Sequence, residues 1–286
     1  MTDTALAPLQ IDRREDGGAI VWLDAGDRPV VVMNQELLGR LNSTIDVLEA
    51  ELPAWIVLAS TSARSFVAGA DLAEINSLND DALTDYMVEG QRVFGRLAHF
   101  PRPIVAAISG AVLGGGLELA MHCHAIVATK HGRSNKPFPI GLPEAGLGLC
   151  PAWGGTQLLA GRISPATAVQ ATAEGRPFKS DAMPAGLVDH IVDTADDVLD
   201  AACTQASGMT ATPPIDISRI DAVALRAACT QARGLQTRAA DAVTACIEAT
   251  LDRNLAAGLA AERANIVALR NTTDTKARID AFLNRG

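Results

Sequence analysis

Aromatic residues make up only 3% of this 286-residue chain, too few for the stacking platforms of single-strand binders. Basic residues are the minority: 24 Lys and Arg against 33 Asp and Glu give a formal net charge of −9, which disfavours a nucleic-acid or anionic-membrane surface. The longest glycine-rich apolar stretch, 104–117, is shorter than the ~20 residues that span a bilayer. The start of the chain does not have the pattern of a signal peptide.

Cysteine pairs and several familiar catalytic motifs are also missing. The five cysteines are odd in number and form no C-x-x-C pair, which is typical of reduced thiols in a cytosolic protein. The sequence has no dinucleotide or P-loop glycine fingerprint, no G-x-S-x-G and no H-E-x-x-H. His122 and His124 are two residues apart on an expected helix and cannot share a face, so we expect no metal site there. We therefore expect a cytoplasmic protein that binds neither nucleic acid nor membrane.

Apolar segments alternate between strand-like and helix-like patterns along the first 192 residues, which predicts an α/β architecture with mostly parallel strands. Beyond residue 163 the strand signal nearly vanishes, and 208–216 has the composition of a linker. We accordingly divide the chain into an α/β core, 1–195, and a helical region, 196–286. The expected strands are 19–23, 29–33, 54–60, 104–109 and 125–129, with a loop at 65–71. The expected helices are 34–52, 82–100, 117–123, 238–271 and 273–284.

Two glycine-containing segments follow expected strands and offer backbone N–H groups to a ligand. In Phe66–Asp71 the small residues permit close approach, although an ordinary loop with Asp71 as a helix N-cap explains the same pattern. In 114–116 three glycines open a helix and expose N–H donors, although tight packing of that helix on the sheet is an equal alternative. Preorganised N–H groups of this kind stabilise a developing oxyanion.

Two carboxylates accompany these segments in apolar surroundings. Glu118 lies in the first turn of the expected helix, where it also suits the helix dipole. Glu144 lies in the glycine-rich segment 141–148, where desolvation would raise its pKa toward a useful general-acid range, unless it is a surface carboxylate. Together, N–H donors and two such carboxylates form a coherent set for acid–base chemistry on an oxyanion.

Four ordered motifs give the chain a resemblance to the crotonase (enoyl-CoA hydratase/isomerase) superfamily. They are FVAGAD at 66–71, PRPIVAAISGAVLGGGLELA at 101–120, GLPEAGLGLCPAWGGTQ at 141–157 and AGLVDHIV at 185–192. The sequence of the third motif is most similar to the hydratase portion of multifunctional fatty-acid oxidation α-subunits. Since no dinucleotide glycine fingerprint follows it, we expect a stand-alone version without the dehydrogenase. The resemblance implies a spiral of β-β-α units with a C-terminal helical region that forms trimers, often paired into hexamers.

Carried over to this chain, the resemblance implies an oxyanion hole made by the N–H groups of Ala70 and Gly115. It implies catalytic roles for Glu118, which would activate water, and Glu144, which would deliver a proton. The reaction would be reversible syn addition of water to a trans-2-enoyl-CoA, with no metal or redox cofactor; coenzyme A is part of the substrate. The remaining predicted substrate-binding residues are Ala68, Gly69, Asp71, Gly114, Phe282 and Arg285.

The chain departs from the family in two ways that bear on this reading. Glu118 and Glu144 are 26 residues apart, more than usual, and the polar insertion 130–139 holds the extra length and could displace Glu144. Trp153 stands in a turn where small residues are usual, either near the acyl chain or simply packed. Other crotonase reactions (isomerisation, dehalogenation, decarboxylation or thioester hydrolysis) stay open, as does a non-catalytic subunit that binds acyl-CoA.

Overall fold

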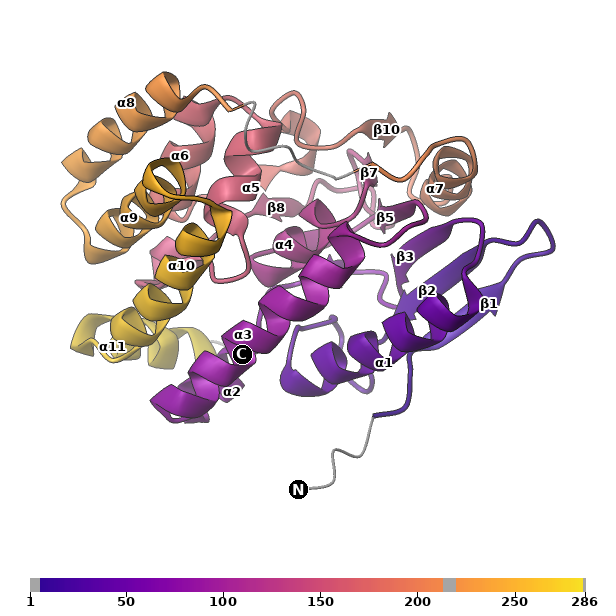
Figure 1. Ribbon diagram of the computed structural model, residues 1–286, viewed down its shortest axis with the longest axis horizontal. Coiled ribbons are helices and arrows are strands. Elements are labelled where there is room, and N and C mark those ends of the chain that lie inside the picture. The colour runs from indigo at the N-terminus through magenta and orange to yellow at the C-terminus, as the bar shows by residue number, and fades with distance from the viewer. Residues whose placement is uncertain (1–5, 213–219, 285–286) are drawn as a thin grey trace.

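The computed structural model describes residues 6–212 and 220–284, which form two sheets enclosed by helices (Figure 1). The larger sheet has six strands in the order β1-β2-β3-β5-β7-β10. Every neighbouring pair in it is parallel except β1–β2. Its strands are β1 Gln10–Arg13, β2 Ala19–Leu23, β3 Ile56–Ser60, β5 Ile104–Ile108, β7 Ala125–Thr129 and β10 His190–Val192.

The smaller sheet carries the segments on which the site is built. Its four strands lie in the order β4-β6-β8-β9, and only β8–β9 is antiparallel. Each of its first three strands leads within a few residues to a glycine-containing turn that reaches the cavity described below. The strands are β4 Ser65–Val67, β6 Ala111–Leu113, β8 Pro139–Gly141 and β9 Phe178–Lys179.

The helices form a layer on each face of the larger sheet and a cluster at one end of the molecule (Figure 1). The α-helices of the α/β region are α1 Gln35–Glu51, α2 Leu72–Ser77, α3 Asp80–Ala98, α4 Gly115–Met121, α5 Gly155–Arg162 and α6 Pro165–Glu174. Those that follow are α7 Val198–Ser207, α8 Ala222–Ala232, α9 Arg238–Asp252, α10 Leu255–Arg270 and α11 Thr273–Leu283. The short 3₁₀ helices are η1 Glu144–Leu147, η2 Ser180–Ala182 and η4 Arg233–Leu235. None of the helices in the described ranges is long and apolar enough to cross a membrane.

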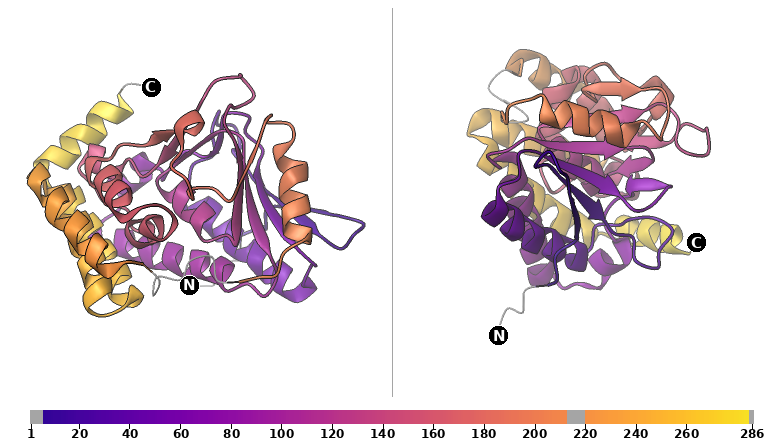
Figure 2. Two further views of the ribbon diagram at one scale, coloured as in Figure 1. Left: turned by 90° about the horizontal axis from the view of Figure 1, so that it is seen from above. Right: turned by 90° about the vertical axis from the view of Figure 1, so that its right-hand side faces the viewer.

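Alternate residues of the central strands face two different cores, because successive side chains of a strand point to opposite faces. Val57 of β3 and Val105 of β5 pack with Val198 and Ala202 of α7. Their neighbours Leu58 and Ile104 belong to the larger core on the other face. Figure 2 shows α7 alone on its side of the sheet. The division at residue 195 stays a prediction, but α7, which lies just beyond it, covers this sheet rather than joining the other C-terminal helices.

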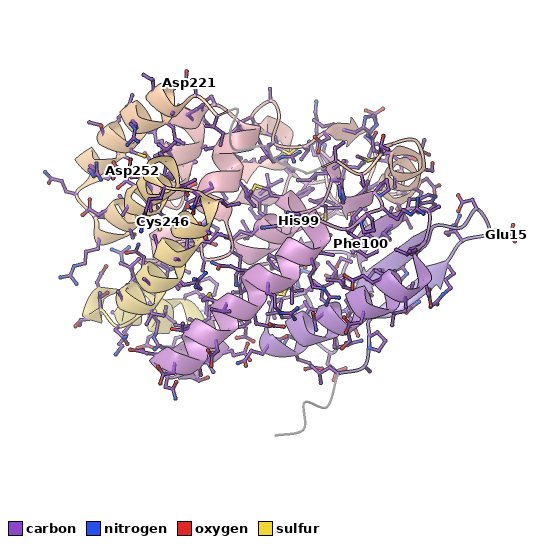
Figure 3. The ribbon with its side chains drawn as sticks, in the orientation of Figure 1. Glu15, His99, Phe100, Asp221, Cys246 and Asp252 are labelled. Atoms are coloured by element: carbon purple, nitrogen blue, oxygen red, sulfur yellow. The ribbon has the colours of Figure 1, made fainter. Side chains whose placement is uncertain are left out.

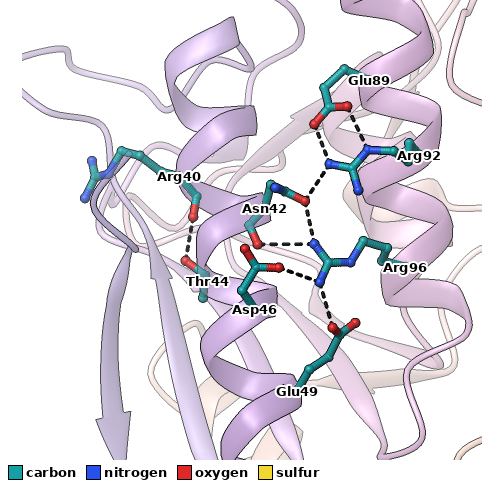
Figure 4. Close-up of polar contacts among 8 residues, drawn as sticks. All are labelled: Arg40, Asn42, Thr44, Asp46, Glu49, Glu89, Arg92 and Arg96. Atoms are coloured by element: carbon teal, nitrogen blue, oxygen red, sulfur yellow. Dashed lines mark hydrogen bonds and ion pairs between the residues drawn. The ribbon is translucent and has the colours of Figure 1, made fainter. Parts of the chain in front are cut away.

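Polar contacts fasten α1 to α3 across the surface of the larger core (Figure 4). Arg96 of α3 donates to the carboxylates of Asp46 and Glu49 on α1, at 2.7 and 2.8 Å. Arg92 and Arg96 both donate to Oδ1 of Asn42, at 2.7 and 2.5 Å. These contacts fix the position of α3 against α1. The face of α3 that bears Tyr86 and Gly90 then lies toward Trp153 of the site.

Several predicted elements differ from the structure. Residues 29–33 form no strand, and their only ladder pairing with a described residue is an isolated parallel bridge between Met33 and Ala70. Pro29 has no N–H, and the N–H of Val31 donates to a side chain, Oγ of Ser65, at 3.0 Å. The predicted loop 65–71 begins as β4. The single helix expected over 238–271 is two helices, because Asn254 caps a new one. The expected linker 208–216 has no regular structure as far as residue 212, and its remainder lies outside the described residues.

Candidate active site

A cavity of about 570 Å³ lies between the two glycine-containing loops, η1 and the C-terminal helices. Its walls are mainly apolar side chains and backbone, the usual character of a small-molecule site. It collects nine of the ten site residues predicted from sequence, and the tenth, Arg285, lies outside the described residues. The nine are Ala68, Gly69, Ala70, Asp71, Gly114, Gly115, Glu118, Glu144 and Phe282.

The loop after β4 runs beside residues 31–33 and leaves one N–H unused. The N–H of Met33 donates to the carbonyl of Gly69 at 2.8 Å, and the N–H of Asp71 donates to the carbonyl of Met33 at 2.9 Å. Between them, the N–H of Ala70 donates no hydrogen bond to any described residue. The N–H of Ala70 is therefore available to a ligand in the cavity.

The turn after β6 presents a second unused N–H. Gly114 has a positive φ of 51°, which suits glycine. Its N–H donates to the carbonyl of Gly141 at 2.9 Å. Gly115 is the first residue of α4, so its N–H has no acceptor within the helix, and none is found elsewhere in the described part of the chain. A Cβ at Gly114 would lie 2.6 Å from Oε1 of Glu144, so this glycine is needed to bring the second carboxylate beside α4.

Glu118 extends from the first turn of α4 and is only 1% exposed. Its Oε1 accepts the N–H groups of Trp153 and Gly155, both at 2.8 Å. Burial raises the pKa of Glu118 from 4.5 to about 7, while the backbone donors act in the opposite direction. Since those donors favour the ionised form, Glu118 is the carboxylate equipped to carry the charge near neutral pH.

Glu144 opens η1 and lines the same cavity. Its Oε2 is buried and has no hydrogen-bond partner among the described residues. Burial, and then the nearby charge of Glu118, raise the pKa of Glu144 well above 4.5. The two glutamates thus have unequal surroundings, which is how a site separates a proton acceptor from a proton donor. The insertion 130–139 does not displace Glu144 from the cavity.

Trp153 is a wall of this cavity and fills the space left by two glycines. It is 2% exposed and stacks edge-on against Tyr86 and Phe94 of α3, with ring centroids 5.4 and 5.3 Å away. A Cβ at Gly90 or at Gly115 would come within 2.1 or 2.3 Å of the indole. The sequence left its direction open; the structure shows that it packs between α3 and α4 while one part lines the cavity.

The side chain of Asp71 is occupied by structural contacts. It caps α2 by accepting the N–H groups of Ala73 and Glu74, and it pairs with Arg28 at 2.7 Å. Only its position on the cavity wall is compatible with the predicted contact to substrate. Phe282 of α11 also lines the cavity while remaining 53% exposed. Its contribution to substrate binding stays a prediction.

One buried carboxylate was missed from the sequence. Glu262 of α10 is 0% exposed and lies on the buried stripe of that helix with Gly258, Ile266 and Leu269. Its oxygens accept the N–H groups of Gly154 and Thr156, which flank one of the amides bound by Glu118. A charged residue at a position of the apolar stripe was the available signal, because such residues are rarely fully buried without partners.

Comparison with known proteins identifies the family of this chain. The family model described as "Enoyl-CoA hydratase/isomerase" matches residues 26–243. The chain belongs to this family. A "Probable enoyl-CoA hydratase" of Bacillus subtilis is 36% identical over 162 residues, 56% of this chain and 60% of that protein. A "Fatty acid oxidation complex subunit alpha" of Shewanella halifaxensis is 35% identical over 189 residues, 64% of this chain and 26% of that protein.

Solved structures show the same fold at lower identity. A carnitinyl-CoA dehydratase from Mycobacterium thermoresistibile has a TM-score of 0.69 at 20% identity, covering 96% of this chain and 89% of that one. Human mitochondrial delta3-delta2-enoyl-CoA isomerase also has a TM-score of 0.69, at 21% identity, and covers 97% of both chains. The predicted crotonase-like fold is confirmed. The match spans about 60% and a quarter of the length of the two curated relatives named above, and this enoyl-CoA hydratase/isomerase family contains more than one reaction.

The raised pKa of Glu144 predicts a stability gain when its charge is removed. Above about pH 4.5 the folded chain retains this proton while the unfolded chain releases it, so rising pH destabilises the fold. We expect Glu144→Gln to raise Tm by a few degrees at pH 8, at roughly 2–4 °C for each ~1 kcal/mol, and to have no such effect near pH 4.5. Thermal unfolding at both pH values measures it. Glu15→Gln, at the exposed turn between β1 and β2 (Figure 3), is the control and should change neither value.

Proposed function

We propose that this protein catalyses reversible syn addition of water to trans-2-enoyl-CoA, giving 3-hydroxyacyl-CoA. One observation carries the proposal: the buried Glu118 and the partly buried Glu144, whose surroundings differ, share a cavity with two unused backbone N–H groups. Family membership supplies the acyl-CoA substrate class. Coenzyme A would belong to the substrate, and the proposed chemistry needs no separate metal or redox cofactor.

In the proposed mechanism, the N–H groups of Ala70 and Gly115 bind the thioester oxygen and stabilise the enolate that forms. Ionised Glu118 accepts a proton from a water molecule while the oxygen of that water bonds to C3 of the substrate. Protonated Glu144 then gives its proton to C2, and the enolate returns to a thioester. The substrate gains H and OH in total. The two glutamates exchange protonation states, which proton exchange with solvent restores.

The test is incubation of the full chain with crotonyl-CoA. The proposal expects loss of the absorbance of the conjugated enoyl thioester and formation of 3-hydroxybutyryl-CoA, identified by mass spectrometry. Failure to hydrate crotonyl-CoA or longer trans-2-enoyl-CoA thioesters would contradict it. Retained binding of a saturated acyl-CoA without any turnover would favour a non-catalytic subunit instead.

A second candidate is double-bond isomerisation, which needs one main base. The free, buried Oε2 of Glu144 favours it, because Oε1 of Glu118 is already held by two backbone donors. A 3-enoyl-CoA substrate distinguishes the two reactions, because an isomerase converts it to the conjugated 2-enoyl product without adding water. Glu118→Gln should abolish hydration but spare isomerisation by Glu144.

We also propose a trimer or a pair of trimers, on the resemblance alone. The apolar residues of 238–271 are only in part available to a partner. Five of them are buried within one chain, namely Val243, Cys246, Ile247, Ile266 and Leu269, while Leu251, Leu255 and Leu259 stay partly exposed. We expect light scattering to give three or six times the subunit mass of 29.8 kDa. A mass near one subunit, at concentrations where the protein turns over substrate, would contradict the oligomer. The cytoplasmic location stays a prediction.

A further inference from the structure

Four successive backbone N–H groups are divided between two buried carboxylates. The N–H groups of Trp153 and Gly155 donate to Oε1 of Glu118, both at 2.8 Å. The N–H of Gly154 donates to Oε2 of Glu262 at 2.7 Å, and the N–H of Thr156 donates to its Oε1 at 3.1 Å. The hydroxyl of Thr156 adds a 2.6 Å bond to the same oxygen. Glu118 and Glu262 therefore accept alternate N–H groups of the same turn, residues 153–156.

This turn needs outside support to keep its shape. It opens α5, whose first N–H groups have no acceptors within the helix. Gly154 has φ +99°, a conformation that glycine adopts readily. Because glycine has no side chain, residue 154 cannot stabilise the turn by packing. A Cβ at Gly155 would lie 2.9 Å from Oε1 of Glu118, so the catalytic carboxylate rests directly against the glycine backbone. A shift of the turn would therefore move the proposed water-activating group with it.

Glu262 is placed to prevent such a shift. It comes from α10, 144 positions after Glu118 in the chain, yet it reaches the same turn because α10 packs closely here. A Cβ at Gly258, one helical turn before Glu262, would come within 2.7 Å of Nε2 of Gln157 on α5. Glu262 is fully buried and is not among the residues that line the cavity. It can act on the reaction only through the turn and through its charge.

We propose that Glu262 is a positioning residue for Glu118, fixing the 153–156 turn whose other two N–H groups aim the Glu118 carboxylate at the cavity. The proposal rests on the proposed function, in which Glu118 activates water. It gives the C-terminal helices a part in catalysis that does not depend on contact with the ligand.

The pKa of Glu118 gives the proposal a measurable signature, because the N–H groups that favour its ionised form belong to the turn that Glu262 holds. Burial, and then the charge of Glu118, raise the pKa of Glu262 itself well above 4.5. The titratable groups facing the turn are Glu118 from α4, Cys246 from α9 (Figure 3), and Glu144 and Cys150 from the segment around η1. His122 of α4 also faces it, and burial lowers the pKa of this imidazole to about 4, so it is neutral near pH 7. None of the ion pairs among described residues involves Glu118 or Glu262. Like charges this close disfavour each other's ionisation.

The test compares Glu262→Gln with the wild type over a pH series. Glutamine keeps the size of the side chain but removes the ionisable carboxyl group and one of the two acceptor oxygens. We expect kcat to fall about 10-fold or more with KM changed less than about twofold. We also expect the acid limb of kcat to move to higher pH, because a loosened turn would hold the N–H groups of Trp153 and Gly155 less firmly against Glu118, and these donors favour its ionised form. Glu248→Gln on α9, which removes only an exposed pairing with Arg233, should leave all three quantities unchanged.

Two further measurements keep the inference testable. Thr156→Val removes one donor to Glu262 and retains both carboxylates, so a smaller fall in kcat is expected even if Glu262→Gln does not fold. Amide hydrogen exchange at Trp153 and Gly155 should quicken in either folded variant, whether or not crotonyl-CoA is the true substrate. Unchanged exchange, kcat and acid limb in a folded variant would overturn the positioning role. A wild type that fails to turn over crotonyl-CoA would count against the proposed function alone, and the exchange result would then decide the role of Glu262.

Discussion

Glu118→Gln and Glu144→Gln are each expected to lower the rate of crotonyl-CoA hydration by at least ~10²-fold, as for the loss of a positioned acid or base. In Glu118→Gln the amide oxygen can still accept the N–H groups of Trp153 and Gly155, so the turn stays held while the proton acceptor is lost. In Glu144→Gln the buried site keeps its shape but has no acidic proton to deliver. Steady-state kinetics at pH 7 measures both.

Binding must be separated from chemistry in this test. Titration calorimetry with butyryl-CoA, the saturated analogue, should give similar Kd values for the wild type and both variants. Glu15→Gln on the exposed turn between β1 and β2 serves as the matched control and should keep full activity. Either cavity variant that hydrates crotonyl-CoA at a near-native rate would remove that glutamate from the mechanism.

The interaction between the two glutamates has a consequence for the wild type. The proposed mechanism needs Glu118 ionised and Glu144 protonated, and the pKa of Glu118 is raised to about 7 while burial and the charge of Glu118 raise the pKa of Glu144 well above 4.5. Activity should therefore rise as pH increases through about 7 and fall again at higher pH, when Glu144 loses its proton. Because the groups interact, the two limbs belong to the pair rather than to one residue each.

Local sequence patterns predicted the parts of the site that local chemistry determines. Alternating strand and helix periodicity located β2, α1, β5 and β7, and glycines after expected strands located the two segments that hold the unused N–H groups. Glu118 and Glu144 were identifiable because each follows such a glycine segment. Their meeting in one cavity was not evident from residue patterns alone, and only the ordered motifs of the family implied it.

The features that the sequence patterns did not predict depend on contacts between distant segments of the chain. Residues 29–33 have strand-like composition, but their partners are the loop around Ser65 and Gly69, so no regular ladder forms. Glu262 is one charged residue in an Ala-rich helix, and its partners lie about a hundred positions earlier. The direction of Trp153 follows from the space left by Gly90 and Gly115 on two different helices. Such pairings are tertiary and have no local signature.

The packing of Trp153 also determines how the oxyanion donor at Gly115 can be tested. A Cβ at position 115 would lie 2.3 Å from the indole, so Gly115→Pro in the wild type would disturb packing as well as remove the N–H. Trp153→Val provides the needed room, and the informative pair is Gly115→Ala against Gly115→Pro in that background. Both add a Cβ, but only proline lacks the donor.

We expect Gly115→Pro/Trp153→Val to hydrate crotonyl-CoA about 10²- to 10³-fold more slowly than Gly115→Ala/Trp153→Val, the usual cost of losing one oxyanion donor, ~3–4 kcal/mol. Gly115 is the first residue of α4, where proline is tolerated because its N–H has no helical acceptor, so the fold should persist. Circular dichroism checks this for both variants. The loss should be in kcat, since the donor binds the enolate more tightly than the ground-state carbonyl. Equal kcat values in the two folded proteins would mean that Gly115 binds no oxyanion, leaving Ala70 as the sole backbone donor.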